Sequence, residues 1–153
     1  MALFGRNATT VGLDIGSGLI KLVVISHGSG GPVLTKVAFT SVVNDAIVEG
    51  EVMDPGIVAE AIKGLMASAG IKAKKVVTAV GGRDVIIKKI AMDRMKEAEA
   101  REVIRWEAEQ HVPFDMDNVE LDFQILDPEA EGLQMTVLLV AAKRELVEHK
   151  LAL

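Results

Sequence analysis

The sequence predicts an α/β protein made of two consecutive parts, the first with the order β-β-β-α-β and the second with the order β-α-β-β. Short apolar or alternating runs, typical of strands, recur between turn residues along the whole chain. Two longer segments instead carry apolar residues at the spacing of a helix. Gly81-Gly82 interrupts the pattern between these parts, so we place the domain boundary there.

The first part begins with three predicted strands. Residues 1–10 are expected to be a flexible leader, and residues 11–15 and 19–26 form a hairpin around Gly16-Ser17-Gly18. Both strands are apolar almost throughout, which is typical of a sheet covered on both faces. Residues 33–40 alternate and are predicted to pair antiparallel with the second strand, followed by an irregular stretch with a turn at residues 49–51.

The clearest helix starts at Asp54-Pro55. Asp54 is suited to accept backbone N–H bonds as the N-cap, and proline fits the first helical position. Gly70 is expected to end the helix. Its apolar stripe consists of Ile57, Val58, Ala61, Ile62, Leu65, Met66 and Ala69. Residues 76–80 are then predicted to form a short buried strand parallel to the first strand.

The second part contains a strand at residues 84–92 and a helix from about residue 96 to 111. Two i,i+4 ion pairs are expected on that helix, Glu97–Arg101 and Arg105–Glu109. Residues 119–126 alternate, and residues 133–142 form another strand. The predicted inward side chains of the first of these strands are Val119, Leu121, Phe123 and Ile125. Residues 143–153 begin a helix with no stop signal, so we expect this helix to continue.

The composition excludes several classes of protein. The 153 residues carry a net charge of −5 with no long basic run, which argues against nucleic acid as the main partner. No cysteine is present, so disulfides and thiolate metal sites are excluded. Neither a secretory signal nor an apolar run near the roughly 20 residues of a membrane span is visible, so the protein is expected in the cytoplasm.

The stretch around the first turn carries the best candidate site. Asp14 precedes the turn, Lys21 follows it, and Gly16, Ser17 and Gly18 lie between them. Glycines let a ligand approach the main chain, and successive N–H groups in such a turn converge on an anion. Asp14 is suited to hold a magnesium ion through water. The residues alone equally allow a plain hairpin with solvated flanking charges.

The segment DIGSGLIK resembles the first phosphate loop of the actin, Hsp70 and sugar-kinase ATPase superfamily. The resemblance implies a ribonuclease-H-like core and assigns Asp14, Gly16, Ser17, Gly18 and Lys21 to the phosphates of Mg-ATP. The spacing of Asp14 and Lys21 is that of the superfamily.

A second segment, IRWEAEQHVPFDMDNVELDF (residues 104–123), is similar to the signature of the PilM family, FtsA-like proteins of type IV pilus assembly. This resemblance implies a partial actin-like core in residues 11–82, an inserted subdomain in residues 83–142 and a helix returning to the core in residues 143–153. Family members continue further and carry the second phosphate loop there. This chain alone is therefore expected to bind ATP and magnesium weakly or not at all, and not to be an enzyme.

PilM proteins bind the cytoplasmic N-terminal tail of the inner-membrane protein PilN, between the core and the inserted subdomain. The resemblance thus implies PilN as partner, with other pilus proteins possible, and a location beside the inner membrane. Arg83, Val85 and Trp106 are our candidates for the tail site. From its helical position, Trp106 is placed at the edge of the core, with a partner anchor as the alternative. The strand at residues 76–80 is expected to leave an apolar edge that allows self-association.

Two other functions fit the sequence less well. A sugar-kinase-type phosphotransferase shares the first loop, but no substrate base is recognisable. A plain interaction module, in which the turn is only structural, is the other alternative. The acidic residues Asp115, Asp117, Glu120 and Asp122 are interpreted as a solvated face rather than a metal cluster, and the three histidines lack ligand spacing.

Overall fold

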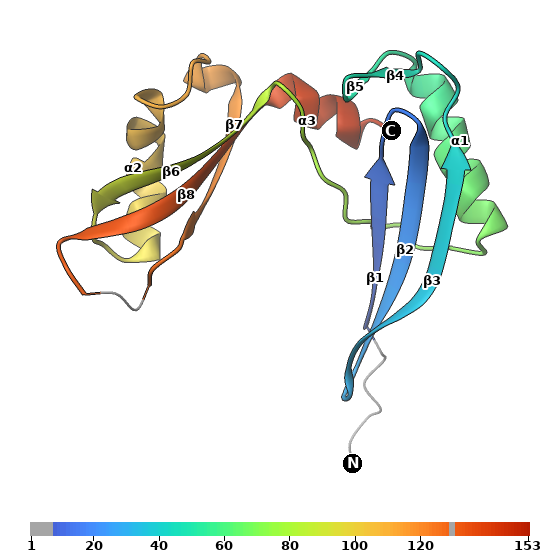
Figure 1. Cartoon of the computed structure of the whole chain (residues 1–153), viewed down its shortest axis with the longest axis horizontal. Helices are drawn as coiled ribbons and strands as arrows, with labels where there is room; N and C mark the ends of the chain where they lie inside the picture. Colours follow the sequence, from blue (N-terminus) through green and yellow to red (C-terminus); the bar gives the residue numbers. More distant parts are fainter. Residues whose placement is uncertain (1–7, 129–130) are drawn as a thin grey trace. The chain divides into compact units, whose positions relative to one another are not determined.

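The structure is a computed structural model that describes residues 8–128 and 131–153. The chain forms two compact units (Figure 1): one ends at Ala79 and also includes Ala152 and Leu153, and the other is Val80–Leu151. The boundary thus falls after Ala79, one residue before Gly81-Gly82. The first seven residues of the expected leader and residues 129–130 of the acidic turn lie outside the described residues, and the first strand already begins at Ala8.

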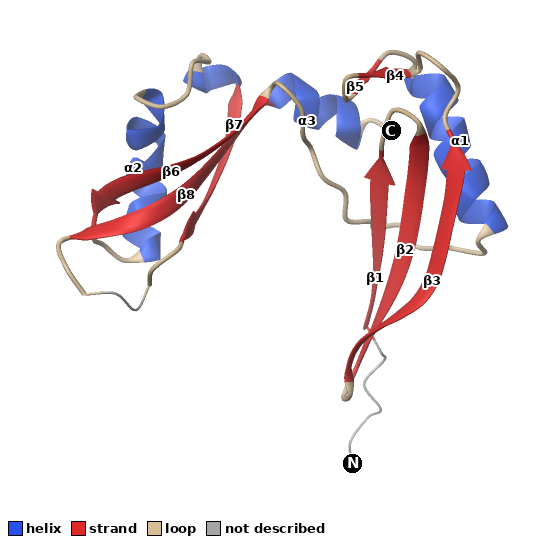
Figure 2. Cartoon of the chain, in the orientation of Figure 1, coloured by secondary structure: helices blue, strands red, loops and turns tan. Residues whose placement is uncertain are grey.

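The first unit contains an antiparallel sheet with the order β1-β2-β3 (Figure 2), made of β1 (Ala8–Ile15), β2 (Leu19–Gly28) and β3 (Gly31–Ser41). The short strands β4 (Ile47–Val48) and β5 (Glu51–Val52) form a small hairpin. Glu49 and Gly50 between them have φ angles of 51° and 91°, as a tight hairpin turn requires. The predicted turn at residues 49–51 is therefore confirmed.

Helix α1 (Pro55–Ser68) has the predicted ends. The Asp54 side chain accepts a hydrogen bond from the Ile57 N–H at 3.0 Å, which satisfies one of the unpaired donors at the helix start. Gly70 adopts a φ of 65°, and the Ile71 N–H closes the last turn on the Met66 carbonyl. The buried side chains Val58, Ile62 and Leu65 pack against Leu13, Ile15, Ile20 and Leu22 of the sheet, forming the core of the first unit.

Residues 76–80 lie beside β1, but they form no regular strand. A single parallel bridge joins Gly12 and Val77, with two backbone hydrogen bonds of 2.8 Å. The predicted parallel direction is confirmed, whereas the predicted burial is wrong, because the Val77 side chain is 62% exposed. Among the described residues nothing pairs with the outer side of this segment. Self-association through this edge stays a prediction.

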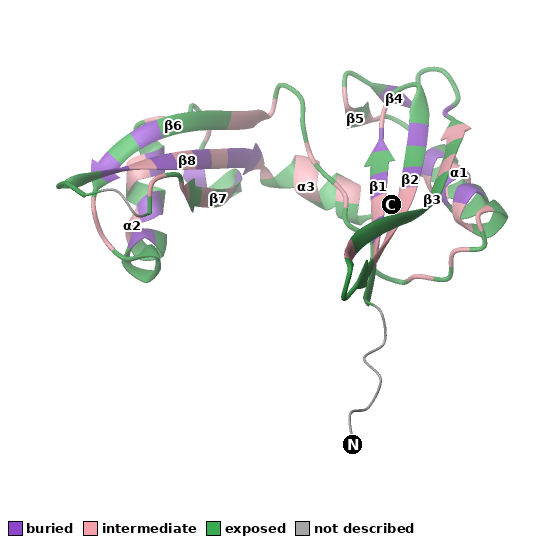
Figure 3. Cartoon of the chain, turned by 60° about the horizontal axis from the view of Figure 1, so that its bottom comes forward, coloured by how far each residue is buried: buried purple, intermediate pink, exposed green. Residues whose placement is uncertain are grey.

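The first sheet is covered by a helix on one face. The face opposite α1 carries Val23, Val37 and Phe39, which lie side by side in the ladders of β2 and β3. Val37 and Phe39 are 60% and 69% exposed, and β3 is coloured mostly as exposed in Figure 3. The expectation of a sheet covered on both faces is therefore wrong for the described residues, which bury only the face toward α1.

The second unit is a three-stranded antiparallel sheet with the order β6-β8-β7 and a helix packed on it. Its elements are β6 (Val85–Asp93), α2 (Glu97–Glu109), the 3₁₀ turn η1 (Met116–Asn118), β7 (Val119–Ile125), β8 (Gln134–Lys143) and α3 (Arg144–Leu151). All predicted elements of this part are present, with ends shifted by one or two residues, as is usual for helix and strand boundaries.

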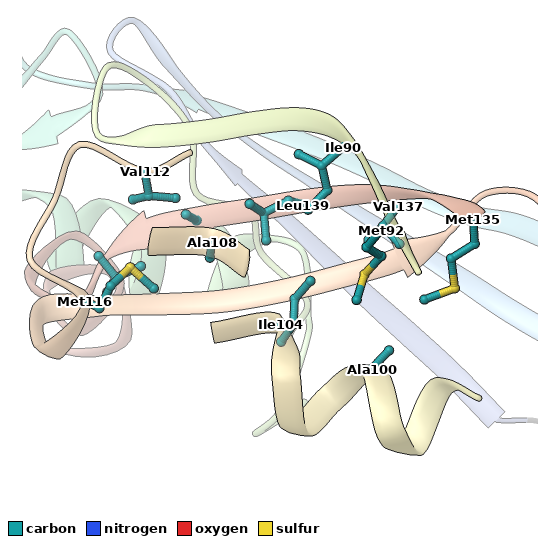
Figure 4. Packing of buried hydrophobic residues seen from close by; sticks show 12 residues of the cluster. Ile90, Met92, Ala100, Ile104, Ala108, Val112, Met116, Met135, Val137 and Leu139 are labelled. Carbon is teal, nitrogen blue, oxygen red and sulfur yellow. The ribbon is translucent and has the colours of Figure 1, made fainter. Parts of the chain in front are cut away.

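The core of this unit lies between α2 and one face of the sheet (Figure 4). Ala100, Ile104 and Ala108 point from α2 toward Val137 and Leu139 of β8, and all five side chains are buried. The predicted inward set of β7 is confirmed, since Val119 belongs to this cluster and Leu121, Phe123 and Ile125 pack against it. With few aromatic residues available, the cluster is completed by methionines, which fill irregular gaps well.

One of the two predicted ion pairs on α2 is present. Arg101 pairs with Glu97 at 3.0 Å, as predicted. The Arg105–Glu109 prediction is wrong, because Arg105 instead reaches η1 and donates to the Met116 carbonyl and the Asp117 carboxylate, both at 2.8 Å. A half-buried carbonyl and a carboxylate together bind the planar guanidinium better than one exposed glutamate does.

Candidate functional site

The turn between β1 and β2 brings the predicted loop residues together. Asp14 lies directly opposite Lys21 in the ladder, and the Lys21 ammonium bonds the Asp14 carboxylate at 2.8 Å. Both side chains are more than half exposed and lie on the sheet face opposite α1. Since successive strand residues alternate between faces, the buried neighbours Leu13, Ile15, Ile20 and Leu22 fix this orientation.

The backbone of the turn is partly free to receive a ligand. The Gly16 N–H donates to the Leu19 carbonyl, and the Gly18 carbonyl accepts from Val42, which holds the turn against the end of β3. Within the described part of the chain, the N–H groups of Ser17 and Gly18 have no hydrogen-bond partner. A Cβ at Gly16 would approach the Leu19 carbonyl to 3.1 Å, so a larger residue would disturb this turn.

A shallow cavity of about 360 Å³ adjoins the Asp14–Lys21 pair. Its walls come from β1, from β2 and from the segment beside β1, with Gly12, Val23 and Val77 among the lining residues. Gly12 has no side chain to project into this cavity, and a Cβ there would lie 3.0 Å from a Val23 methyl group. The cavity therefore has an apolar floor with one carboxylate and one ammonium at its rim.

These groups fit a phosphate and its magnesium ion in part. Two free N–H groups and one ammonium are suited to phosphate oxygens. Magnesium usually keeps several waters and takes one or two carboxylates, so Asp14 can supply one ligand through water. In residues 8–128 and 131–153 no three His, Cys, Asp or Glu side chains cluster as a metal site of their own.

The first two candidates for the partner site lie at the start of β6. Arg83 precedes this strand, and Val85 is its first residue. Ile86 packs against the core, so Val85 and the next odd-numbered residue, Ile87, lie on the sheet face opposite α2. Ile87 is 66% exposed and pairs with the half-buried Val140 of β8.

β6 is an edge strand, so its backbone N–H and C=O groups point alternately toward β8 and away from the sheet. The Lys143 N–H donates to the Asp84 carbonyl at 3.1 Å, which makes these residues a hydrogen-bonded pair that continues the β6–β8 register. Bonded and non-bonded pairs alternate in an antiparallel ladder. The outward-facing N–H and C=O groups are therefore those of the odd-numbered residues, and Ile87 and Lys89 combine such groups with exposed side chains.

Trp106 lies on the other side of this unit. It is 72% exposed, and it lies on α2 about 160° around the helix axis from the centre of the buried stripe of Ala100, Ile104 and Ala108. The predicted position at the edge of the core is therefore wrong. The predicted position was judged from Val103 and Ile104, whereas the buried side chains are centred about 50° further around the axis, toward Ala108. Val85 and Trp106 are thus on opposite faces of the unit and are not brought together.

The acidic residues 115–122 serve local structure. Asp115 caps η1 by accepting from the Asp117 N–H, Asp117 binds Arg105, and Glu120 binds Arg144 at 2.8 Å. The hydrogen bond and the charge of Glu120 raise the pKa of the Arg144 guanidinium above its ordinary value. The pair of Arg144 with Glu120 joins the start of α3 to β7.

Sequence reasoning missed Ile87 as a candidate for the exposed edge. Its signal is present in VIIKKIAM (residues 85–92), where alternation from Ile86 through Ile90 and Met92 places Ile87 on the other face. An apolar residue on the expected solvent face of an edge strand is the pattern to look for.

No helix of the described residues is long and apolar enough to cross a membrane.

The chain is similar to known proteins in two comparisons. The profile of the family described as type IV pilus assembly protein PilM matches residues 12–153. The chain is also similar to a solved structure described as the PilM-PilN type IV pilus biogenesis complex, with 35% sequence identity and a TM-score of 0.83. That match covers 96% of this chain and 44% of the other, so the chain spans less than half the length of that relative.

A more distant likeness is to the cytoplasmic domain of EpsL, an inner membrane component of the type II secretion system of Vibrio cholerae. The TM-score is 0.56 at 12% identity, and the match covers 94% of this chain and 51% of that one. Identity at this level shows the fold alone. Together the two likenesses confirm the predicted fold class, an α/β fold of the actin-like kind.

Proposed function

The chain belongs to the family of the type IV pilus assembly protein PilM, and from this premise we propose that it acts as a cytoplasmic scaffold that holds the PilN tail beside the inner membrane. The observation that carries the proposal is the 35% identity, over 96% of the chain, to a protein whose structure was solved in complex with PilN.

The proposed tail site in the second unit is the edge of β6. An extended peptide adds readily to an exposed sheet edge, where main-chain hydrogen bonds supply affinity and alternate side chains supply selectivity. The outward N–H and C=O groups of Ile87 and Lys89 support this mode of binding. The exposed Ile87 and the half-buried Val85 offer apolar contacts on one face, and Arg83 lies at the start of the same edge.

Trp106 is left out of this tail site for a geometric reason. A peptide paired with β6 contacts the sheet face opposite α2, whereas Trp106 lies on the outer surface of α2. One extended tail does not reach both without passing around the unit. We therefore assign Arg83, Val85 and Ile87 to the PilN tail.

The test is a titration of a fluorescently labelled PilN tail with the chain and two variants. Val85→Asp places a charge among the apolar contacts and is expected to weaken binding at least about tenfold. Trp106→Ala is the matched control on the opposite face and should bind as the unchanged chain does. Absence of saturable binding to the folded chain contradicts the tail proposal. Weakening by Trp106→Ala alone places the tail on α2 instead.

We further propose that Asp14, Gly16, Ser17, Gly18 and Lys21 form the first phosphate loop for Mg-ATP in the full-length protein. The two unpartnered N–H groups of the turn, the Lys21 ammonium and the adjoining cavity of about 360 Å³ support this assignment. The loop supplies one side of a phosphate site. Weak or absent ATP binding by this chain alone is expected on the same basis.

A further inference from the structure

The outer surface of α2 carries an exposed anchor that the tail proposal does not use. Trp106 is the one tryptophan in the chain and is 72% exposed on a helix face turned away from the sheet. A large aromatic side chain on a solvent-facing helix surface is costly to leave in water, and tryptophan is the residue most enriched at interaction hot spots.

The two charged side chains one helical turn before and after Trp106 are both glutamates. Glu102 precedes it by four residues and Glu109 follows it by three, so both carboxylates lie next to the indole on the same face. Among the described residues, neither carboxylate has an ion-pair or hydrogen-bond partner. The arginines of the helix, Arg101 and Arg105, are bound to Glu97 and Asp117 instead.

The end of α2 adds a second electrostatic reason. Its last turn contains Glu107 and Glu109 and no basic residue. The carbonyl end of a helix carries a partial negative charge, so glutamates there are unfavourable and cations are favourable. A cation supplied from outside would bind the Glu109 carboxylate and the helix end together. A basic partner would therefore stabilise this end of α2.

We propose that this surface, formed by Glu102, Trp106 and Glu109, docks an arginine-bearing segment of a partner protein. Arginine fits better than lysine, because its planar guanidinium stacks on an indole and bonds a carboxylate in the same contact. Glu102 and Glu109 are separated by about 10 Å along the helix axis. The complementary segment thus presents two arginines about 10 Å apart, as two residues seven positions apart on a helix do.

This site does not depend on the PilN proposal, because it lies on the opposite face of the unit from Val85. It gives the second unit two separate binding surfaces, one at the edge of β6 and one on α2. A scaffold that joins two proteins needs such a pair of surfaces.

The test uses the fluorescence of Trp106, which reports on this surface alone. The probe is a synthetic alanine-based helical peptide with two arginines seven positions apart and a leucine between them. Its matched control has the same composition with the arginines five positions apart, so that they point in different directions. We expect a saturable change in Trp106 emission with the probe, binding roughly tenfold weaker for the control peptide, and weakening by salt.

Protein variants complete the test. Glu102→Gln combined with Glu109→Gln keeps the shape of the surface and should weaken the probe about tenfold, whereas Glu51→Gln, an exposed carboxylate of the first unit, should have no effect. Trp106→Ala, measured with a labelled peptide, should weaken binding similarly. Equal binding of both peptides, or binding unaffected by the double variant, overturns the proposal. An emission change that depends only on the concentration of the chain itself assigns the surface to a second copy and also overturns it.

Discussion

At the scale of single residues, Lys21 and Asp14 give the most direct test of the phosphate loop. Each variant, Lys21→Ala and Asp14→Ala, removes one charged group from the rim of the cavity. In the full-length gene product each should weaken Mg-ATP binding by about tenfold or more, because a charge-assisted hydrogen bond contributes roughly 1.5–3 kcal/mol. Calorimetric titration measures the affinity. Lys63→Ala, which removes another surface lysine, is the control, and unchanged affinity in both loop variants contradicts the loop assignment.

Thr78 offers a prediction about stability. Its hydroxyl oxygen is buried and has no hydrogen-bond partner among the described residues. Burying an unsatisfied hydroxyl costs free energy, and valine has nearly the same shape without the polar atom. Thr78→Val should therefore raise the free energy of unfolding by about 1 kcal/mol in urea titrations. Thr78→Ser keeps the hydroxyl and removes a methyl group, so it should lower stability. A destabilising valine would show that the hydroxyl does have a partner.

The structural roles of single residues were predicted correctly where those roles depend on residues nearby in the sequence or in one hairpin. The Asp54 cap, the Gly70 ending and the Asp14–Lys21 neighbourhood all follow from contacts within a few residues or from the register of one hairpin. The exposure of Trp106 does not follow in this way. It depends on which side of α2 the sheet contacts, and a shift of the stripe centre by about 50° moves the indole from the core edge to the outer surface.

At the scale of elements, Arg105 connects the end of α2 to η1. Arg105→Ala removes the bonds to the Met116 carbonyl and the Asp117 carboxylate and should lower the free energy of unfolding by roughly 0.5–1.5 kcal/mol. Lys63→Ala on α1 is the control, because loss of its exposed i,i+3 pair with Glu60 costs only roughly 0.2–0.5 kcal/mol. Chemical denaturation followed by circular dichroism compares them, and equal losses contradict the connecting role.

The order of the elements was predictable because strand and helix periods, caps and turn residues agree along most of the chain. The sequence of one element does not show which other elements pack around it. Residues 76–80 are apolar and read as a buried strand, yet Val77 is exposed because no described element covers that edge. Similarly, the i,i+4 spacing of Arg105 and Glu109 is correct on the helix, but η1 competes for the arginine from twelve residues away.

At the scale of the whole molecule, each unit has its own buried cluster. A cavity in one cluster should therefore loosen that unit first. Leu139→Ala in the second unit is expected to cost roughly 2–5 kcal/mol and to speed amide hydrogen exchange in Val80–Leu151, with less change in the first unit. Leu22→Ala should give the reciprocal pattern. Exchange rising equally in both units for either variant contradicts separate cooperative units.

The path of the chain through these units has a consequence for biosynthesis. The chain leaves the first unit after Ala79, builds all of Val80–Leu151 and returns at Ala152, and Leu153 packs against the first cluster. Translation adds about 5–20 residues each second, so several seconds separate Ala79 from Leu153 on the ribosome. The second unit is continuous in sequence and is free to fold during that interval. The first unit receives the contact of Leu153 only after its neighbour has been made, so its buried cluster lacks that side chain while the second unit is being synthesised.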